Sequence, residues 1–489
     1  MIARDEQDYL PGCLASVAGV VDEIVLVDTG SCDRTMDIAR AAGANVVQHA
    51  WNDDFAAARN AALEAVSGDW ILVLDADERL APGAGAAITR ALYAPNFDCG
   101  FLPLYNARHL ADSAERVLSS PEARYDEPCA VARLFRRTPD LRWQGCVHET
   151  VTTWLQARPS AVRRVEAPIV HYGYTPEVGL PRAKKQRNLA LLERYCANEP
   201  DDPQPWTYFA WELLTASDPA VAARAASAAE SGWQALCATA RQLPPSAVRA
   251  RLPSPVGLAS VRALCALNAH DLDKAQDTLT RAEAWGAEHP NLCLLSAVLT
   301  ERRADEPQLQ AADRRAYLER ACELYARCIE LGRYVYSDWL IDGATSWFAH
   351  TGLALCELEL DRVASALEHF EAALRTRSNH TPALLGRAEA LITLGHAAHA
   401  LPQLLALLED ADVRRHADGW LLAALACVQL GAHADREVFM QRAAATLATG
   451  GGVASWRQRR VLARLAGNEQ TTQRPRSAKR ARRSKRHKA

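Results

Sequence analysis

The sequence predicts an α/β domain over residues 1–180 and an all-helical repeat domain over residues 181–468. In the first domain, short apolar runs alternate with helical patterns, an order that requires a parallel sheet with right-handed crossovers. In the second, alanine- and leucine-rich helical patterns replace the strands from about residue 200, and small residues recur every 34 positions. Residues 469–489 complete the chain as a basic tail.

The elements of the first domain follow from the spacing of its apolar residues. The expected order is helix 9–20, strand 23–27, helix 32–42, strand 46–47, helix 55–66 and strand 70–74. Ser31 or Asp33 is the expected cap of the second helix, and Gly43 ends it. Each strand is thus followed by a helix that returns the chain to the same edge of the sheet.

The strand 70–74 is the feature around which this domain is organised, because it ends in Asp75 and Asp77. In open α/β sheets, ligands bind beyond the carboxyl ends of the strands, so chemistry is expected at these carboxylates. Two carboxylates at i and i+2 can hold a hard divalent cation that keeps positions free for phosphate oxygens. The other interpretation is that Asp75 and Asp77 are only polar residues at the point where the strand passes into a loop, a place where Asp is common.

Four pieces of sequence occur in order around this strand: Ile24 to Thr35 (IVLVDTGSCDRT), Asp53-Asp54-Phe55 with Arg59-Asn60, Gly68-Asp69-Trp70, and Leu74 to Glu78 (LDADE). Together they resemble the inverting glycosyltransferases of family 2, which have the GT-A fold. They are most similar to a bacterial subgroup that includes lipopolysaccharide-core glucosyltransferases and the S-glycosyltransferases of glycopeptide bacteriocins.

The resemblance implies a Rossmann-like nucleotide-sugar-binding domain that transfers a sugar with inversion, most often from a UDP-linked donor. It implies that Asp28, Ser31, Arg59 and Asp75 bind the nucleotide sugar, and that Asp77, with Asp75, binds Mg²⁺ or Mn²⁺. Asp28 can accept hydrogen bonds from base or ribose, Ser31 stands in a turn that favours anions, and Arg59 offers a planar fork to phosphate. The alternative is that Asp28 only shapes the turn and Arg59 is a solvated helix residue.

The start of the chain departs from the family. Members usually have an apolar strand before a sequence such as Met-Ile-Val-Lys-Asn-Glu-Glu, whereas this chain begins at Met1 with Met-Ile-Ala-Arg-Asp-Glu-Gln. We therefore expect most of the first strand to be missing. Either the true start lies upstream, or nucleotide binding is impaired.

Beyond Glu78 the sequence predicts two antiparallel strands, over 99–106 and 132–136. The resembled subgroup carries an Arg-Leu-Phe-Arg segment followed by Gly-x-x-His-Glu, matched here by residues 133–136 and 145–149. An inverting transfer needs a group that takes the proton of the acceptor. Glu149 is the first candidate for this base and His148 the second. A surface His-Glu pair is the alternative.

Further candidates lie after residue 168. His171 follows two apolar residues, and Lys184 and Arg187 stand at the start of an expected helix. His171 resembles the C-terminal histidine that completes the metal site of many GT-A enzymes, although a lone histidine is more often a satisfied core residue. Lys184 and Arg187, with neighbouring Lys185 and Asn188, resemble a Lys-x-x-Arg-Asn segment of the subgroup and can face the diphosphate. A solvated basic helix face is the alternative.

The helical half resembles a tetratricopeptide array. Four residues recur at a distance of 34, namely Gly352, Ala354, Leu360 and Ala366 as Gly386, Ala388, Leu394 and Ala400. A third copy covers 420–443, looser units cover 202–214 and 271–290, and the match is poor over 215–255 and 300–340. Such arrays stack helix pairs and bind peptides on their concave face. Self-association is the alternative use.

Composition limits the remaining possibilities. The net charge of −3 provides no general attraction to polyanions, and 13 scattered cysteines without a CxxC pair suit reduced thiols in a cytoplasm. No apolar run reaches 18 residues, so no transmembrane span is expected. The tail after residue 470 has nine Lys or Arg and no large apolar residue, so we expect disorder. The tail can contact anionic lipid headgroups, as at an inner membrane face, or nucleic acid, but the expectation is a solvated tail with weak polyanion affinity and no specific nucleic-acid binding.

The leading hypothesis is a cytoplasmic, metal-assisted glycosyltransferase whose acceptor is recruited partly by the repeats. The acceptor can be a glycan, a peptide or protein, or a small molecule, and neither it nor the donor sugar follows from the sequence. The alternative hypothesis is a peptide-binding scaffold with a vestigial transferase domain. Retention of Arg59, Asp75, Asp77, His148 and Glu149 together favours the enzyme.

Overall fold

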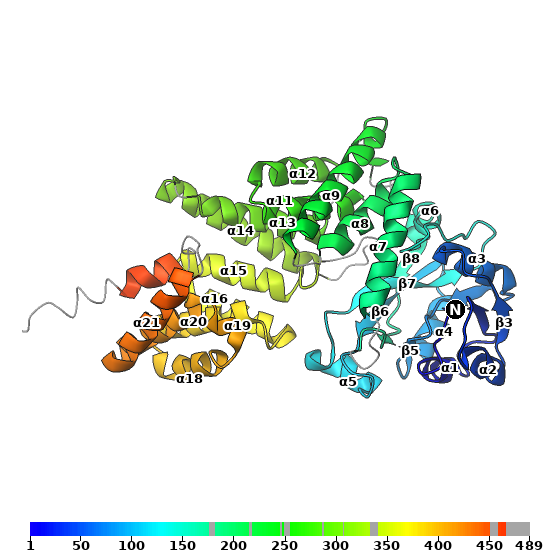
Figure 1. Ribbon diagram of the computed structural model, residues 1–489, viewed down its shortest axis with the longest axis horizontal. Coiled ribbons are helices and arrows are strands. Elements are labelled where there is room, and N and C mark those ends of the chain that lie inside the picture. The colour runs from blue at the N-terminus through cyan, green and yellow to red at the C-terminus, as the bar shows by residue number, and fades with distance from the viewer. Residues whose placement is uncertain are drawn as a thin grey trace, which may run out of the picture. The chain divides into compact units, whose positions relative to one another are not determined.

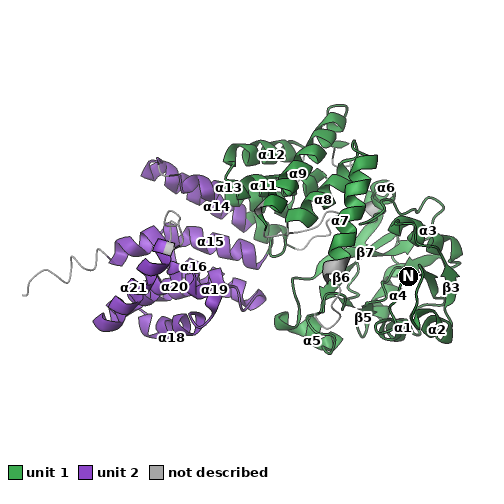
Figure 2. Cartoon of the chain, viewed as in Figure 1, with its two compact units in different colours: residues 1–299, 327–345 green, residues 300–326, 346–489 purple. Residues whose placement is uncertain are grey.

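The computed structural model describes residues 1–175, 181–214, 218–244, 247–248, 255–285, 288–306, 308–332, 341–449 and 458–465. The chain forms two compact units (Figure 2): residues 1–299 with 327–345, and residues 300–326 with 346–489. The expected basic tail, 469–489, lies outside the described residues. Within the described residues, no helix is both long enough and apolar enough to cross a membrane.

The first unit begins with a parallel sheet of three strands, β1 (Ile2–Ala3), β2 (Val25–Asp28) and β3 (Asn45–Gln48), in that order. The two connecting helices are α1 (Leu10–Val17) and α2 (Thr35–Ala41). Both strand pairs are parallel, so the first two predicted crossovers are confirmed. The first strand is present as two residues, and the ammonium of Met1 donates to the carbonyl of Val25 at 2.8 Å.

The second helix starts later than the sequence predicted. It begins at Thr35 rather than at Cys32, because the side chains of Ser31 and Asp33 form hydrogen bonds with residues that precede the helix instead of starting the helix at Cys32. The Asp33 carboxylate accepts from the backbone N–H groups of Thr35 and Gln7, and the hydroxyl of Ser31 donates to the carboxylate of Asp28. The predicted end is confirmed, since Gly43 has φ of +79°, a left-handed conformation that glycine adopts without strain.

A second, mixed sheet completes the α/β part, with its main path in the order β4-β7-β6-β9-β5 and β8 beside β6. Its strands are β4 (Trp70–Leu72), β5 (Glu78–Leu80), β6 (Cys99–Asn106), β7 (Cys129–Arg136), β8 (Val162–Arg164) and β9 (Ile169–His171). The antiparallel pair of β6 and β7 was predicted. The parallel placement of β4 was not correct, because β4 pairs antiparallel with β7, Ile71 opposite Phe135.

Four helices belong to this part: α3 (Phe55–Ala65), α4 (Ala84–Leu92), α5 (Ala114–Ser119) and α6 (Thr152–Gln156). The carboxylate of Asp54 caps α3 by accepting from the N–H of Ala57. A core of fully buried side chains, including Leu102, Leu134 and Ile169, packs on the mixed sheet. This packing fixes the ends of β4 and β9, from which the candidate site residues project.

From residue 181 on, the described residues contain helices and no strand. Figure 1 shows them as successive coiled ribbons from green to red. In the first unit these are α7 (Pro181–Asn198), α8 (Pro203–Leu214), α9 (Pro219–Ala240), α11 (Pro255–Asn268) and α12 (Leu272–Ala284), followed along the chain by α13 (Pro290–Ala304) and α14 (Ala311–Leu331). An α/β domain followed by a helical repeat region is therefore the observed fold class.

The second unit contains the regular repeats. Its helices after α14 are α15 (Trp347–Glu359), α16 (Val363–Thr376), α17 (Thr381–Thr393), α18 (Ala397–Leu407), α19 (Ala411–Arg414), α20 (Ala417–Leu430) and α21 (His433–Thr449). A Cβ atom at Gly352 would lie 2.3 Å from the ring of Tyr325, and one at Gly386 would lie 2.2 Å from the ring of Phe370. The recurring glycines are therefore the places where one helix crosses the preceding helix at close range.

Candidate active site

A cleft of about 1510 Å³ lies in the first unit, where the carboxyl ends of strands meet residues of α7, α8 and the segment 341–345. Eight of the ten site residues predicted from the sequence line it: Arg59, Asp75, Asp77, His148, Glu149, His171, Lys184 and Arg187. Asp28 and Ser31 are not among the lining residues, although their neighbour Thr29 is. Most of the residues predicted from the sequence thus lie together in one cleft, and the structure shows that their contacts differ.

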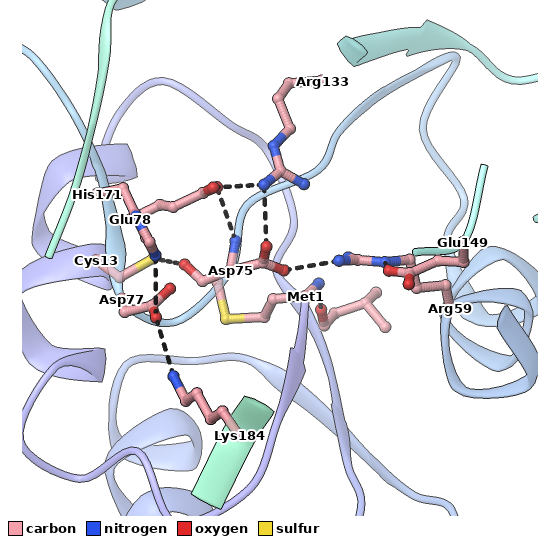
Figure 3. Close-up of polar contacts among 11 residues, drawn as sticks. Met1, Cys13, Arg59, Asp75, Asp77, Glu78, Arg133, Glu149, His171 and Lys184 are labelled. Atoms are coloured by element: carbon pink, nitrogen blue, oxygen red, sulfur yellow. Dashed lines mark hydrogen bonds and ion pairs between the residues drawn. The ribbon is translucent and has the colours of Figure 1, made fainter. Parts of the chain in front are cut away.

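Asp75 is held by two guanidinium groups (Figure 3). Its Oδ1 accepts from Nη2 of Arg59 and its Oδ2 from Nη2 of Arg133, both at 2.9 Å. Burial on its own raises the pKa of Asp75, but the two guanidinium groups more than offset this and hold that pKa far below its usual range. Asp75 is therefore a permanent anion with both oxygens engaged.

The same contacts continue on both sides into an arginine–carboxylate chain, Glu149–Arg59–Asp75–Arg133–Glu78. Nε of Arg59 also donates to Glu149, and Nη2 of Arg133 also donates to Glu78. Arg59 is 9% exposed, so its alternative reading as a solvated helix residue is wrong. The sequence missed Arg133 and Glu78 as site residues, although the Arg-Leu-Phe-Arg match contained the first of them.

Asp77 has a different set of neighbours. Its Oδ2 lies 3.4 Å from Nε2 of His171 and 3.8 Å from Nζ of Lys184. Figure 3 shows the carboxylate between these two side chains. The first comes from the end of β9 and the second from the first turns of α7, so Asp77 connects the sheet to the helical part of the unit.

The orientation of His171 is fixed by its other ring nitrogen. Nδ1 lies 2.7 Å from Oδ1 of Asn106, whose amide nitrogen donates to both oxygens of Asp126 at 3.0 Å. The amide oxygen is thus the acceptor, Nδ1 carries the proton, and Nε2 faces Asp77. Burial lowers the pKa of His171, but the Asp77 carboxylate more than offsets this and raises that pKa. Both ring nitrogens of His171 have polar partners, as the alternative of a satisfied histidine expects, but the residue also lines the cleft, and its role as a metal ligand stays a prediction.

Gly173 permits this arrangement. A Cβ atom at this position would lie 2.1 Å from Oδ2 of Asp77 and 2.6 Å from Nε2 of His171. Only a residue without a side chain leaves the carboxylate and the imidazole in place. The signal in the sequence was the glycine two positions after His171, whose importance depends on a contact that spacing does not encode.

The pair of Asp77 and His171 fits a divalent cation that takes most of its ligands from elsewhere. A carboxylate oxygen and an imidazole nitrogen are both ligands of Mn²⁺, and a cation bound to phosphates needs few protein ligands. Over the described part of the chain, no group of three or more His, Cys, Asp or Glu side chains is placed to hold a metal ion. A cation held by this pair would take its remaining ligands from water and phosphate oxygens.

Glu149 and His148 point to different partners. Glu149 contacts Arg59 and is 11% exposed, while the ring of His148 stacks on that of Tyr208 with centroids 4.5 Å apart. Nε2 of His148 lies 3.4 Å from Oε1 of Glu212, also on α8. The alternative of a solvated surface pair is therefore wrong for Glu149, and both side chains line the cleft.

Asp28 organises the turn that follows β2. Its Oδ1 accepts from the N–H groups of Gly30 and Ser31 at 3.0 Å, and its Oδ2 accepts from the hydroxyl of Ser31 at 2.5 Å. The side chain is 1% exposed. The turn-forming role that the sequence left open is thus present. Any direct role of Asp28 and Ser31 in nucleotide binding stays a prediction.

Cationic side chains border the same cleft. The guanidinium of Arg187 lies over the ring of Phe55 at 5.0 Å, and burial together with the charge of Arg4 lowers its pKa. Arg4 also lines the cleft and was not predicted. With Lys184, these residues form a cationic border that suits an anionic ligand.

Glu6 is a further acid of the cleft that the sequence reading did not select. Burial, and next the charge of Asp77, raises the pKa of Glu6 to about 7. Its sequence signal was weak, because the segment Asp5-Glu6-Gln7 reads as an ordinary polar loop. A carboxylate of this kind titrates in the neutral pH range, which matters for any measurement of pH dependence.

The first part of the chain is similar to known proteins. Residues 1–113 match the model of the family described as Glycosyl transferase family 2. A tetratricopeptide repeat-containing protein of Synechococcus elongatus is 39% identical over 208 residues, which cover 41% of this chain and 48% of that protein. The SPbeta prophage-derived glycosyltransferase SunS of Bacillus subtilis is 27% identical over 214 residues, covering 43% and 47%. The chain spans about half the length of these curated relatives.

Among solved structures, the chain is similar to YrrB, described as a TPR protein with an unusual peptide-binding site, at 13% identity and a TM-score of 0.31 over 43% of this chain and 91% of that one. It is also similar to the type IV pilus biogenesis factor PilW, at 16% identity and a TM-score of 0.35 over 53% and 98%. The family match and the glycosyltransferase relatives support sugar transfer by the N-terminal domain.

Proposed function

We propose that this protein transfers a sugar from a nucleotide-linked donor to an acceptor, with inversion and with the help of Mg²⁺ or Mn²⁺. We propose UDP as the nucleotide, because it is the commonest one in the families resembled. The observation that carries the proposal is the pair of Asp77 and His171, 3.4 Å apart in a cleft bordered by Lys184 and Arg187. An acid and an imidazole beside two cationic side chains suit a diphosphate with a divalent cation.

The donor diphosphate then lies between the Asp77–His171 pair and the cationic border. When bound, a divalent cation supplies positive charge to the departing diphosphate. Lys184, Arg187 and Arg4 bind phosphate oxygens, and Asp28 with Ser31 orders the turn that brings Thr29 to the cleft. Asp75 acts as the anion that fixes Arg59 and Arg133, since both of its oxygens are engaged.

An inverting transfer also needs a proton acceptor on the face of the sugar opposite the diphosphate. Glu149 is the first choice, because Arg59 fixes its carboxylate at the wall of the cleft. His148 is the second, held by its stacking on Tyr208. In either case the residue takes the proton of the acceptor as the acceptor atom bonds to the anomeric carbon and the diphosphate leaves with the bonding electrons.

We infer that the acceptor enters beside α8, which lines the cleft with Tyr208 and Trp211. Aromatic side chains at this place suit a sugar ring or an apolar peptide segment. The acceptor classes suggested by the resembled subgroup are a lipopolysaccharide core and a peptide cysteine or serine. The proposed location is the cytoplasm, where nucleotide sugars are made.

A screen for hydrolysis of sugar nucleotides tests the proposal, because it needs no acceptor. The full chain is incubated with UDP-glucose and related donors, with and without Mn²⁺, and released nucleoside diphosphate is measured. Turnover is expected with Mn²⁺ and is expected to disappear in Asp77→Asn. Absence of turnover and of UDP binding in the unmodified protein would instead support the alternative, a peptide-binding scaffold with a vestigial transferase domain.

A further inference from the structure

In the second unit, the helical segment 458–465 lies against the repeats although it follows them in sequence. Arg460 bonds two acids on different helices, Glu359 of α15 and Glu389 of α17; its Nε lies 2.9 Å from Oε1 of Glu389. Nη1 of Arg464 donates to the hydroxyl of Thr393 at 2.8 Å. The segment thus bridges two successive repeats.

The residues that receive these guanidinium groups form an acidic site, which we define as Asp305, Glu359 and Glu389. Arg459 pairs with Asp305, at the end of α13. The side chains of Glu359 and Glu389 are 8% and 1% exposed. Carboxylates buried to this degree are costly unless a cation lies beside them. Arg314 of α14 already pairs with Oε2 of Glu359 at 2.6 Å, and Arg460 of the segment pairs with Glu389 and with the other oxygen of Glu359, so the acidic site keeps a place for a second, cationic occupant.

An apolar contact accompanies the charged one. Val461 and Leu465 are 1% and 2% exposed and belong to the core cluster that includes Ile392 and Leu425. On a helix, positions 460 and 464 form one row and positions 461 and 465 form the adjacent row, so a single face carries both kinds of contact. The acidic site and this apolar surface together recognise a helix with arginines and aliphatic residues in neighbouring rows.

The attachment of the segment is short and rich in glycine. Eight residues separate it from α21, and three of them are Gly450, Gly451 and Gly452. An isolated helix of a few turns has little stability of its own in water, so residues 458–465 depend on their docked contacts to stay helical.

We propose that the acidic site and its apolar surface are the docking site for an arginine-bearing amphipathic helix of a partner polypeptide, and that residues 458–465 fill it in the free protein. The partner presents the same face, Arg-Val-x-x-Arg-Leu or a close equivalent, and binds by displacing the segment. The site lies wholly in the second unit, and the proposal does not depend on the transfer chemistry.

The test uses the full chain and a fluorescein-labelled synthetic peptide of residues 456–467, WRQRRVLARLAG. In the double variant Arg460→Glu/Arg464→Glu, the segment should leave the site, and the peptide should bind about 10- to 100-fold more tightly than to the unmodified chain. Adding Glu389→Gln to that variant should remove this gain. A peptide with the same composition but with its arginines and aliphatic residues moved off one face is the control.

Equal peptide affinity for the unmodified chain and the double variant would overturn the proposal, as would an absence of binding to a double variant whose helical circular dichroism is unchanged. If the double variant unfolds, hydrogen exchange of residues 458–465 in the unmodified chain decides. Excess peptide should then abolish the protection of these residues, and unchanged protection would show a permanent cap rather than a displaceable occupant.

Discussion

The smallest change that tests the proposed metal site is Gly173→Ala. The added carbon would lie 2.1 Å from Oδ2 of Asp77 and 2.6 Å from Nε2 of His171, whereas ordinary contact begins near 3.4 Å. The backbone at Gly173 has no positive φ, so alanine meets no conformational strain of its own. Both side chains must therefore move, each by about 1 Å. A displacement of this size costs about 100-fold in a catalytic arrangement.

We expect Gly173→Ala to lower Mn²⁺-dependent hydrolysis of the sugar nucleotide by about 100-fold and to weaken Mn²⁺-dependent UDP binding in calorimetry by a factor of about 10 to 100. Gly68→Ala is the matched control, because a Cβ atom there would meet its nearest neighbour, the carbonyl of Trp70, at 3.4 Å. If Gly173→Ala behaves like this control, Asp77 and His171 do not act together and the assignment of the metal site is refuted.

Three further predictions concern the same cleft. Asp77→Ala should abolish the effect of Mn²⁺ on UDP binding in a calorimetric titration while the melting curve stays within a few degrees of the unmodified chain. Glu149→Gln should retain nucleotide binding and lower transfer to the true acceptor by about two to four orders of magnitude, with His148→Asn showing that loss instead if the histidine is the base. Mn²⁺ must displace a proton from Nε2 of His171, whose pKa lies above its usual value, so Mn²⁺ affinity should rise with pH up to that pKa and level off above it. His171→Gln should remove this part of the rise, and Glu6→Gln should remove the part due to Glu6, whose pKa is raised to about 7.

The arginine–carboxylate chain can be tested through stability. Arg133→Met leaves Glu78, which is 1% exposed, buried without its guanidinium partner. Removing one partner of a buried ion pair costs about 3–5 kcal/mol of unfolding free energy. Urea denaturation should show this loss, and the second change Glu78→Gln should recover part of it. A full loss that persists in the double variant would assign the effect to Asp75 instead.

Much of the fold was predictable because it depends on local patterns. The strand Cys99–Asn106 was predicted over the same residues, and the 34-residue recurrence located Gly352 and Gly386, where helices cross closely. The pairing of β4 was not predictable in the same way. An apolar run indicates burial on both faces but does not say which later strand supplies the hydrogen bonds, and here β7 supplies them.

The site shows the same limit. Asp75 and Asp77 line the cleft, as expected from the rule that ligands bind beyond strand ends, and their part in binding stays a prediction. Their separate roles were hidden, because the residue that distinguishes them, Arg133, reads in the sequence as one more polar position of a strand. A guanidinium reveals its role only through the atoms that it contacts, and those lie on a strand far away in the chain.

The difference between the two aspartates follows from what surrounds each. Two guanidinium groups already neutralise Asp75, so a divalent cation placed on it would face their repulsion and would have to replace both. Asp77 has a lysine at 3.8 Å and a histidine at 3.4 Å, and under the proposed function the loss of the histidine's proton would turn it from a competitor of the metal into a ligand. We therefore assign Asp75 to the wall of the cleft and propose Asp77 as the carboxylate that remains available for the donor and its cation.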